Sequence, residues 1–279
     1  MKLPRINKGL YLNDFISEHG ITKNINNINS KISESLKTNK NVFYINTDYL
    51  LANTFDDFDI KSWYFAKIPY SQNVFHSASL EISNILNLLD GKSIKLIITD
   101  LDNTLWGGVL GDLGWNNIIL GGLNPAGEAY QDFQKKLKSF KNSGVQLAIS
   151  SKNDEKKVLE CFKKNKNMIL KVDDFVNLKI NWGDKAKNIQ NIIKSLNILN
   201  ENVLFLDDNI NERRRVKLAL PGIQVPEMTD DPFNNLKIFS KYGLINNIHN
   251  TTKEDVNRTK YYQDNLSRSK FKETFLSED

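Results

Sequence analysis

The chain has 279 residues, of which 40% are hydrophobic, with a formal net charge of +5 and a pI of about 9.0. This length predicts one or two globular domains with sizeable cores. No apolar stretch approaches the roughly 20 residues that a membrane helix needs, and the first residues lack a signal-peptide core. We therefore expect no membrane partner. One cysteine allows no internal disulfide, which favours the reducing cytoplasm as the location. The positive charge favours anionic partners, but without an aromatic-basic motif we expect no nucleic-acid binding.

The first part of the chain carries no phosphate loop and no cluster of metal ligands. Residues 42–46 are expected to form a strand. The apolar residues between Leu80 and Leu89 predict an amphipathic helix that Gly91 ends. We expect this segment to support packing or to form an oligomer contact.

The next apolar run ends on two carboxylates. Residues 94–105 read IKLIITDLDNTL, in which Asp100 and Asp102 follow the run and Thr104 comes two residues later. Buried parallel strands read as such runs, and ligands of open α/β sheets bind beyond the carboxyl ends of the strands. Two carboxylates suit Mg²⁺, and one of them could attack a phosphorus atom to form an aspartyl-phosphate.

Two further apolar runs end in complementary polar groups. The run at residues 145–149 leads into hydroxyl, ammonium and amide groups that could hold phosphate oxygens: Ser150, Ser151, Lys152 and Asn153. The run at residues 203–206 leads into Asp207 and Asp208, which add carboxylates for a metal. Between these runs, Lys185 begins a helical pattern.

Helical patterns alternate with these runs. Pro125 begins one helix and Asp154 is expected to cap the next. Strands that alternate with helices of this length predict a parallel sheet between helices, which is a Rossmann-like α/β fold.

The order of these motifs resembles the haloacid dehalogenase (HAD) superfamily of phosphohydrolases and phosphotransferases, over about residues 94–227. The resemblance implies that Asp100 is the nucleophile and Asp102 the general acid/base. It implies that Ser151 binds phosphate and that Lys185 steadies the nucleophile and the phosphoryl group. The implied cofactor is Mg²⁺, held by Asp100, by the backbone carbonyl of Asp102 and most directly by Asp208, with Asp207 in support.

A narrower resemblance is to the FkbH-like branch, also named subfamily IIIC. It is carried by the strings DLDNTLWGGVLGDLG, SKNDE, NWGDKAKNI, FLDDNINER and VPEMTDDP, and by TKEDVNRTKYYQDNLSRSKF near the C-terminus. It implies three regions: residues 1–92 as an α/β segment similar to the end of an SGNH-hydrolase-like domain, residues 93–250 as the HAD domain, and residues 251–279 as a helical extension.

The superfamily resemblance also implies a small β-hairpin flap after the first strand, and the spacing between the motifs leaves no room for a large cap domain. We place the flap at residues 106–122, which read WGGVLGDLGWNNIILGG. Glycines permit a close approach to substrate, and a tryptophan could line the pocket. The expected substrate-binding residues are Thr104, Trp106, Gly107, Gly108, Ser150, Lys152 and Asn153.

Characterised FkbH-like members transfer a glyceryl group from 1,3-bisphosphoglycerate to an acyl carrier protein. They hold the acyl group on a cysteine directly before the SKN motif, where this chain has Ser150. A serine hydroxyl is a poorer nucleophile than a thiolate. We therefore expect a Mg²⁺-dependent phosphatase or phosphotransferase acting on a phosphorylated small molecule or a carrier-bound substrate. The alternatives are a glyceryl transferase with an acyl carrier protein as partner and an inactive scaffold.

Overall fold

The computed structural model describes residues 18–36, 59–68 and 70–240, together with residues 39, 42, 43, 45, 50, 51 and 261. The chain divides into two compact units, Met1–Leu89 and Asp90–Asp279. The domain boundaries inferred from the sequence remain predictions, and the expected C-terminal extension lies, except for Tyr261, outside the described residues. Among the described residues, no helix combines the length and the apolar character that a membrane span requires.

The described part of the N-terminal unit includes the helices α1 (Ile21–Leu36), α3 (Ile60–Ala66) and α4 (Gln72–Leu89). Asp59 begins α3, because its carboxylate accepts hydrogen bonds from the backbone N–H groups of Lys61 and Ser62. The predicted helix before Gly91 is confirmed by α4, and Gly91 follows with a φ of 74°. The strand predicted over residues 42–46 lies partly outside the described residues, and residues 42, 43 and 45 belong to no strand.

Parallel strands form the sheet of the second unit, in the order β3-β2-β1-β4. The three predicted strands are confirmed. The fourth was not predicted, because residues 177–179 are half-buried and include the polar Asn177 and Lys179. The strands are β1 (Leu96–Thr99), β2 (Gln146–Ser151), β3 (Phe175–Ile180) and β4 (Val203–Leu206).

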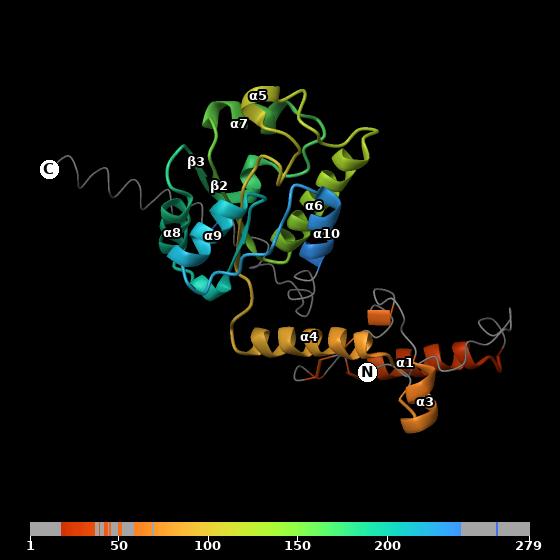
Figure 1. The fold of residues 1–279 in the computed structure, drawn as a ribbon. Coiled ribbons are helices and arrows are strands. Elements are labelled where there is room, and N and C mark those ends of the chain that lie inside the picture. Colours follow the sequence, from red (N-terminus) through yellow and green to blue (C-terminus); the bar gives the residue numbers. More distant parts are fainter. Residues whose placement is uncertain are drawn as a thin grey trace. The chain divides into compact units, whose positions relative to one another are not determined.

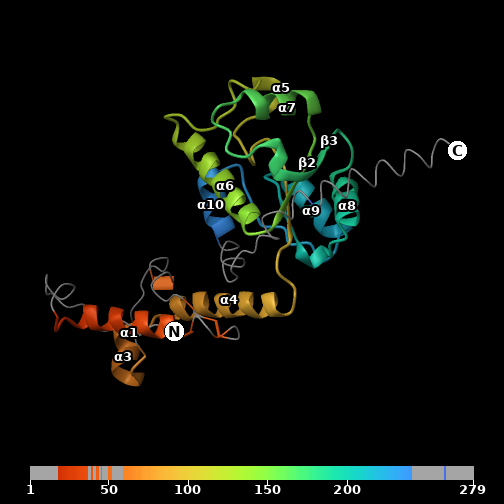
Figure 2. The ribbon, with the colours of Figure 1, turned by 180° about the vertical axis from the view of Figure 1, so that it is seen from behind.

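Alternate residues of the strands face two separate cores. Ile97 belongs to the core that includes residues of α6 and α7, whereas Leu96 and Ile98 belong to the core that includes residues of α8 and α9. Figures 1 and 2 show α6 and α10 on one side of the sheet and α8 and α9 on the other. The helices are α6 (Pro125–Asn142), α7 (Glu155–Lys164), α8 (Lys185–Leu196), α9 (Ile210–Ala219) and α10 (Pro232–Ser240).

The segment after β1 differs from the β-hairpin that we expected. Gly107 and Ile119 form an antiparallel bridge with two backbone hydrogen bonds of 2.9 Å. Between them the chain forms the short helix α5 (Leu110–Leu113), and Leu110 is buried in the core. The flap is therefore a single bridge that encloses a helical turn, and no cap domain is inserted between β1 and α6.

A buried carboxylate ties α6 to the start of β3. Asp174 is 3% exposed, and its oxygens accept from Lys138 at 2.5 Å and lie 3.3 Å from Nζ of Lys141. The backbone N–H of Lys171 also donates to it. These contacts hold the edge strand β3 against the helical layer.

Candidate active site

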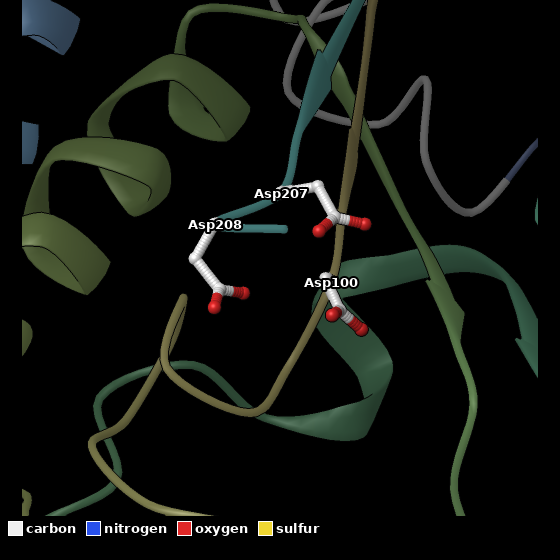
Figure 3. Close-up of side chains that lie close together, drawn as sticks. All are labelled: Asp100, Asp207 and Asp208. Carbon is white, nitrogen blue, oxygen red and sulfur yellow. The ribbon is translucent and has the colours of Figure 1, made fainter. Parts of the chain in front are cut away.

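Three carboxylates meet where the neighbouring strands β1 and β4 end. Asp100 follows β1, and Asp207 and Asp208 follow β4. The backbone N–H of Asp100 donates to the carbonyl of Leu206 at 2.8 Å, so the two strand ends are held side by side. One oxygen from each carboxylate lies within 4.8 Å of the others, and Figure 3 shows the three side chains converging. The predicted meeting of these residues is therefore present in the structure.

Lys185 is the first residue of α8, and its ammonium group lies among these carboxylates. Its Nζ lies 2.8 Å from Oδ2 of Asp100 and 2.7 Å from Oδ2 of Asp207. Asp184 caps the helix by accepting from the backbone N–H of Lys187, which fixes where Lys185 emerges. Although burial favours the neutral amine, the two carboxylates raise the pKa of Lys185. Lys185 therefore stays charged.

The three carboxylates differ in burial and in the hydrogen bonds that they accept from the protein. Asp207 is fully buried, and its oxygens accept from Lys185 and from the backbone N–H of Asn209. Asp208 is only half-buried, and its Oδ1 accepts from the hydroxyl of Thr104 at 3.2 Å. Oδ1 of Asp100 is buried and has no hydrogen-bond partner among the described residues. A buried, unpaired carboxylate oxygen facing two more carboxylates fits a hard divalent cation.

One cation behind the acidic pair was not anticipated from the sequence. Arg213 is 5% exposed, and its Nη1 donates to the backbone carbonyls of Asp207 and Asp208 at 2.9 and 2.6 Å. The backbone N–H of Asp208 donates to Thr104. Arg213 and Thr104 therefore fix the turn that presents the two carboxylates.

Burial and mutual repulsion act on the pKa values of the acidic pair. Burial, and then the negative charge of Asp100, raise the pKa of both Asp207 and Asp208 above the ordinary aspartate value. An added divalent cation would reverse this effect, because it favours the ionised carboxylates.

Asp102 points to donors of its own instead of joining the cluster. Nε1 of Trp106 and the backbone N–H of Leu110 donate to its Oδ1 at 2.9 and 3.0 Å. Nδ2 of Asn153 donates to its Oδ2 at 3.0 Å. Burial raises the pKa of Asp102, while the hydrogen bonds from Leu110 and Trp106 act in the opposite direction. A carboxyl with a raised pKa beside a nucleophile is suited to acid/base chemistry.

A solved structure shares this architecture. It is the N-terminal part of the protein BF1531 from Bacteroides fragilis, described as containing a phosphatase domain and complexed with Mg. It has 33% sequence identity to this chain and a TM-score of 0.80. The fold is the Rossmann-like fold of HAD phosphatases. The match covers 89% of this chain and 66% of that one, so this chain spans just under two thirds of the relative's length.

More distant solved structures also match part of the chain. One is the 3-deoxy-D-manno-octulosonate 8-phosphate phosphatase of Moraxella catarrhalis, with 20% identity, a TM-score of 0.32, and coverage of 68% of this chain and 99% of that one. Another is described as a HAD superfamily (subfamily III A) hydrolase of Legionella pneumophila, with 14% identity, a TM-score of 0.37, and coverage of 70% and 98%. No protein-family model matches the chain, and a search of the curated proteins finds no relative.

The four polar residues at the end of β2 and directly after it lie in different surroundings. Ser150 and Ser151 are both buried within β2, and the Ser150 hydroxyl has no hydrogen-bond partner among the described residues. Lys152 forms an ion pair of 2.7 Å with Glu212, and Asn153 is bound to Asp102. Phosphate binding by Ser150, Ser151 and Lys152 remains a prediction.

The flap residues serve packing and hydrogen bonding within the protein. A Cβ on Gly107 would lie 2.9 Å from side-chain atoms of Ile119 and Tyr130. Gly108 has a φ of +92°, and its backbone N–H donates to the side chain of Asn103. Trp106 is fully buried and donates to Asp102. Their predicted contacts with substrate remain predictions, and these internal contacts explain the residue types without a substrate.

Proposed function

We propose that this protein is a Mg²⁺-dependent phosphatase or phosphotransferase that works through an aspartyl-phosphate on Asp100. The observation that carries the proposal is Oδ1 of Asp100, which has no partner in the part of the chain that the structure describes and is buried beside two further carboxylates, while Oδ2 is fixed by Lys185. The unpaired Oδ1 fits a divalent cation, and Lys185 holds Oδ2 in one place, as a carboxylate nucleophile requires.

The residues present fit a magnesium ion. Asp100 and Asp208 would hold it with the backbone carbonyl of Asp102, and Asp207 would support them through Lys185. Bound Mg²⁺ supplies positive charge that offsets the repulsion between the carboxylates and an incoming phosphate. The similar Bacteroides fragilis structure was crystallised with Mg.

The protein's own groups account for both half-reactions. An oxygen of Asp100 attacks phosphorus, the bond from phosphorus to the leaving oxygen breaks, and Asp102 donates a proton to that oxygen. The ionised Asp102 then takes a proton from water as the water attacks phosphorus, which releases phosphate and restores Asp100. Lys185 and Ser151 would balance the charge on the transferring group.

The FkbH-like motif strings support a substrate that is either a phosphorylated metabolite or a carrier-bound phosphate ester. In the second case, the partner would be an acyl carrier protein. Glyceryl transfer lacks a suitable nucleophile in this chain. Ser150 replaces the cysteine of that branch, and Cys161 is fully buried with a pKa raised by burial to about 12. A scaffold has no use for this cluster, because burying several charges costs free energy that packing alone does not require.

Phosphate release from a panel of phosphate esters tests the proposal. We expect Asp100→Asn to remove nearly all turnover and chelation of Mg²⁺ by EDTA to abolish it, because the nucleophile and the charge compensation are lost. Acid quenching of the wild type during turnover of a ³²P-labelled ester should trap labelled protein, and Asp100→Asn should trap none. Asp132→Asn, on an exposed part of α6, is the matched control. Full activity in EDTA, or in Asp100→Asn, would overturn the proposal.

A further inference from the structure

The carboxylate of Asp102 receives hydrogen bonds from three donors in two separate parts of the fold. Trp106 and Leu110 belong to the flap after β1, and Asn153 belongs to the loop between β2 and α7. The residue that the proposed function assigns to proton transfer therefore joins the flap to a neighbouring strand end.

These donors divide unequally between the two oxygens. Oδ1 accepts both the Trp106 indole N–H and the Leu110 backbone N–H, and, among the described residues, Oδ2 accepts only the Asn153 amide. The orientation of Asn153 is settled by its other end, because its Oδ1 accepts from the backbone N–H of Asp154 at 3.0 Å. A carboxylate oxygen has two lone pairs in its plane. Both are used on Oδ1, and one remains on Oδ2.

We infer that Trp106 and Asn153 are positioning residues: Trp106, with the Leu110 N–H, confines the transferable proton of Asp102 to Oδ2, and Asn153 fixes which lone pair of Oδ2 carries it. This inference rests on the proposed function and extends it to the atom that carries the proton. In the first half-reaction the O–H bond at Oδ2 breaks and the proton passes to the leaving oxygen. In the second, the same lone pair of Oδ2 takes a proton from the attacking water.

Both positioning side chains are held rigidly. Trp106 is fully buried, with its ring edge-on to Phe162 at a centroid distance of 5.9 Å and an interplanar angle of 74°. Asn153 is 4% exposed and directly precedes Asp154, which caps α7. Neither donor needs to reorganise during the reaction, so the unused lone pair of Oδ2 keeps one direction.

Leaving-group dependence separates this role from a purely structural one. An ester with a good leaving group, such as p-nitrophenyl phosphate, needs little protonation, whereas glycerol phosphate needs a proton on its leaving oxygen. We expect Trp106→Phe and Asn153→Ala to lower kcat/KM for glycerol phosphate at least about 10-fold more than kcat/KM for p-nitrophenyl phosphate, since general acid catalysis contributes about 10²- to 10⁴-fold. kcat/KM is the quantity compared because it covers the steps up to phosphoryl transfer to Asp100, whereas hydrolysis of the aspartyl-phosphate is common to both esters. Asp102→Asn removes the acid itself. The ratio between its losses for the two esters is therefore the largest that the positioning variants can reach.

Matched controls come from the same region. Trp115→Phe changes a half-buried tryptophan of the flap, and Asn165→Ala removes an amide that donates to the Trp115 carbonyl at 2.9 Å. Both control variants should keep the wild-type ratio between the activities with the two esters. Asn153→Leu keeps a side chain of similar size without the donor or a charge and should behave as Asn153→Ala, which keeps the test valid if Trp106→Phe does not fold.

The outcomes distinguish the inference from the function on which it rests. Equal losses for the two esters in the Trp106 and Asn153 variants, or wild-type ratios in both, would overturn the inference while leaving the phosphatase assignment intact. Activity that survives Asp100→Asn would instead overturn the proposed function.

Discussion

Nζ of Lys185 lies 2.7 Å from Oδ2 of Asp207, and both side chains are almost completely buried. A buried ion pair of this kind is costly to break, because removing one partner leaves an uncompensated charge in the interior. The pair therefore links the charge balance of the candidate active site to the stability of the fold.

Lys185→Met should separate these two effects. Turnover should fall by at least about 100-fold, since a preorganised positive group at a site of developing charge contributes on that scale. In EDTA the free energy of unfolding should fall by about 3–5 kcal/mol, and added Mg²⁺ should restore part of it. Kinetics and denaturant unfolding measure the two quantities. Lys187→Met, an exposed change on the same helix, is the control and should alter neither. A stable variant with wild-type turnover would contradict the role of Lys185.

The stability of the metal-free protein should fall as pH rises from about 4 to about 7. Burial and the charge of Asp100 raise the pKa of Asp207 from 3.8 to about 7. In that interval the native state binds more protons than the unfolded state, so the free energy of unfolding decreases with pH. Unfolding in EDTA at pH 5 and at pH 7.5 measures the slope. Asp207→Asn should reduce the slope, as should Mg²⁺. Stability that increases across this interval in EDTA would contradict the prediction.

Asp174→Asn should destabilise the protein without affecting phosphate chemistry. Burial alone would raise the pKa of Asp174, but the hydrogen bonds from Lys138 and the backbone N–H of Lys171, together with the charges of Lys138 and Lys141, outweigh burial and hold the pKa below 3.8. The stabilisation is therefore present above about pH 3.8 and is lost as pH falls below that value. Because charge-assisted hydrogen bonds contribute about 1.5–3 kcal/mol, we expect a loss of that size in denaturant unfolding at pH 7.

The comparison for this variant is Asp132→Asn, which removes an exposed pair with Lys135. Exposed pairs contribute about 0–1 kcal/mol, so this change should be nearly neutral. An equal effect of the two substitutions would show that burial of Asp174 adds nothing.

Cys161→Ala should leave turnover unchanged and lower stability modestly. The thiol is fully buried in the core and its pKa is raised to about 12, so it acts as a small apolar group. A thiol reagent at pH 8 should label native protein slowly and denatured protein at once. Rapid labelling of the native state, accompanied by loss of activity, would show a functional thiol.

The strands that carry the candidate nucleophile and the acidic pair could be predicted because they are buried on both faces. The run at residues 203–206 coincides with β4, and the run ending before Asp100 contains β1. Strand β3 was not predicted, because its middle residues are half-buried and two of them, Asn177 and Lys179, are polar. Full burial leaves a continuous apolar signal in the sequence, whereas a partly exposed strand leaves a weaker one.

The contacts among the site residues could not be predicted from the sequence. Asn153 was expected to contact phosphate, but its amide is bound to Asp102, which lies 51 positions earlier. Arg213 stands in a run of three arginines, and only the fold shows that this one is buried against the carbonyls of the acidic pair. Such contacts depend on how strand ends meet in space, and local spacing carries no record of that.

The strand order has a consequence for synthesis of the protein. β1 lies between β2 and β4, but β4 begins only at Val203, long after β1 ends at Thr99. A nascent chain that has not yet exposed β4 leaves one edge of the apolar β1 without a hydrogen-bonding partner, and open apolar edges promote aggregation. The same late strand brings the acidic pair beside Asp100, so the nucleophile cannot meet its metal-binding carboxylates before that edge is closed.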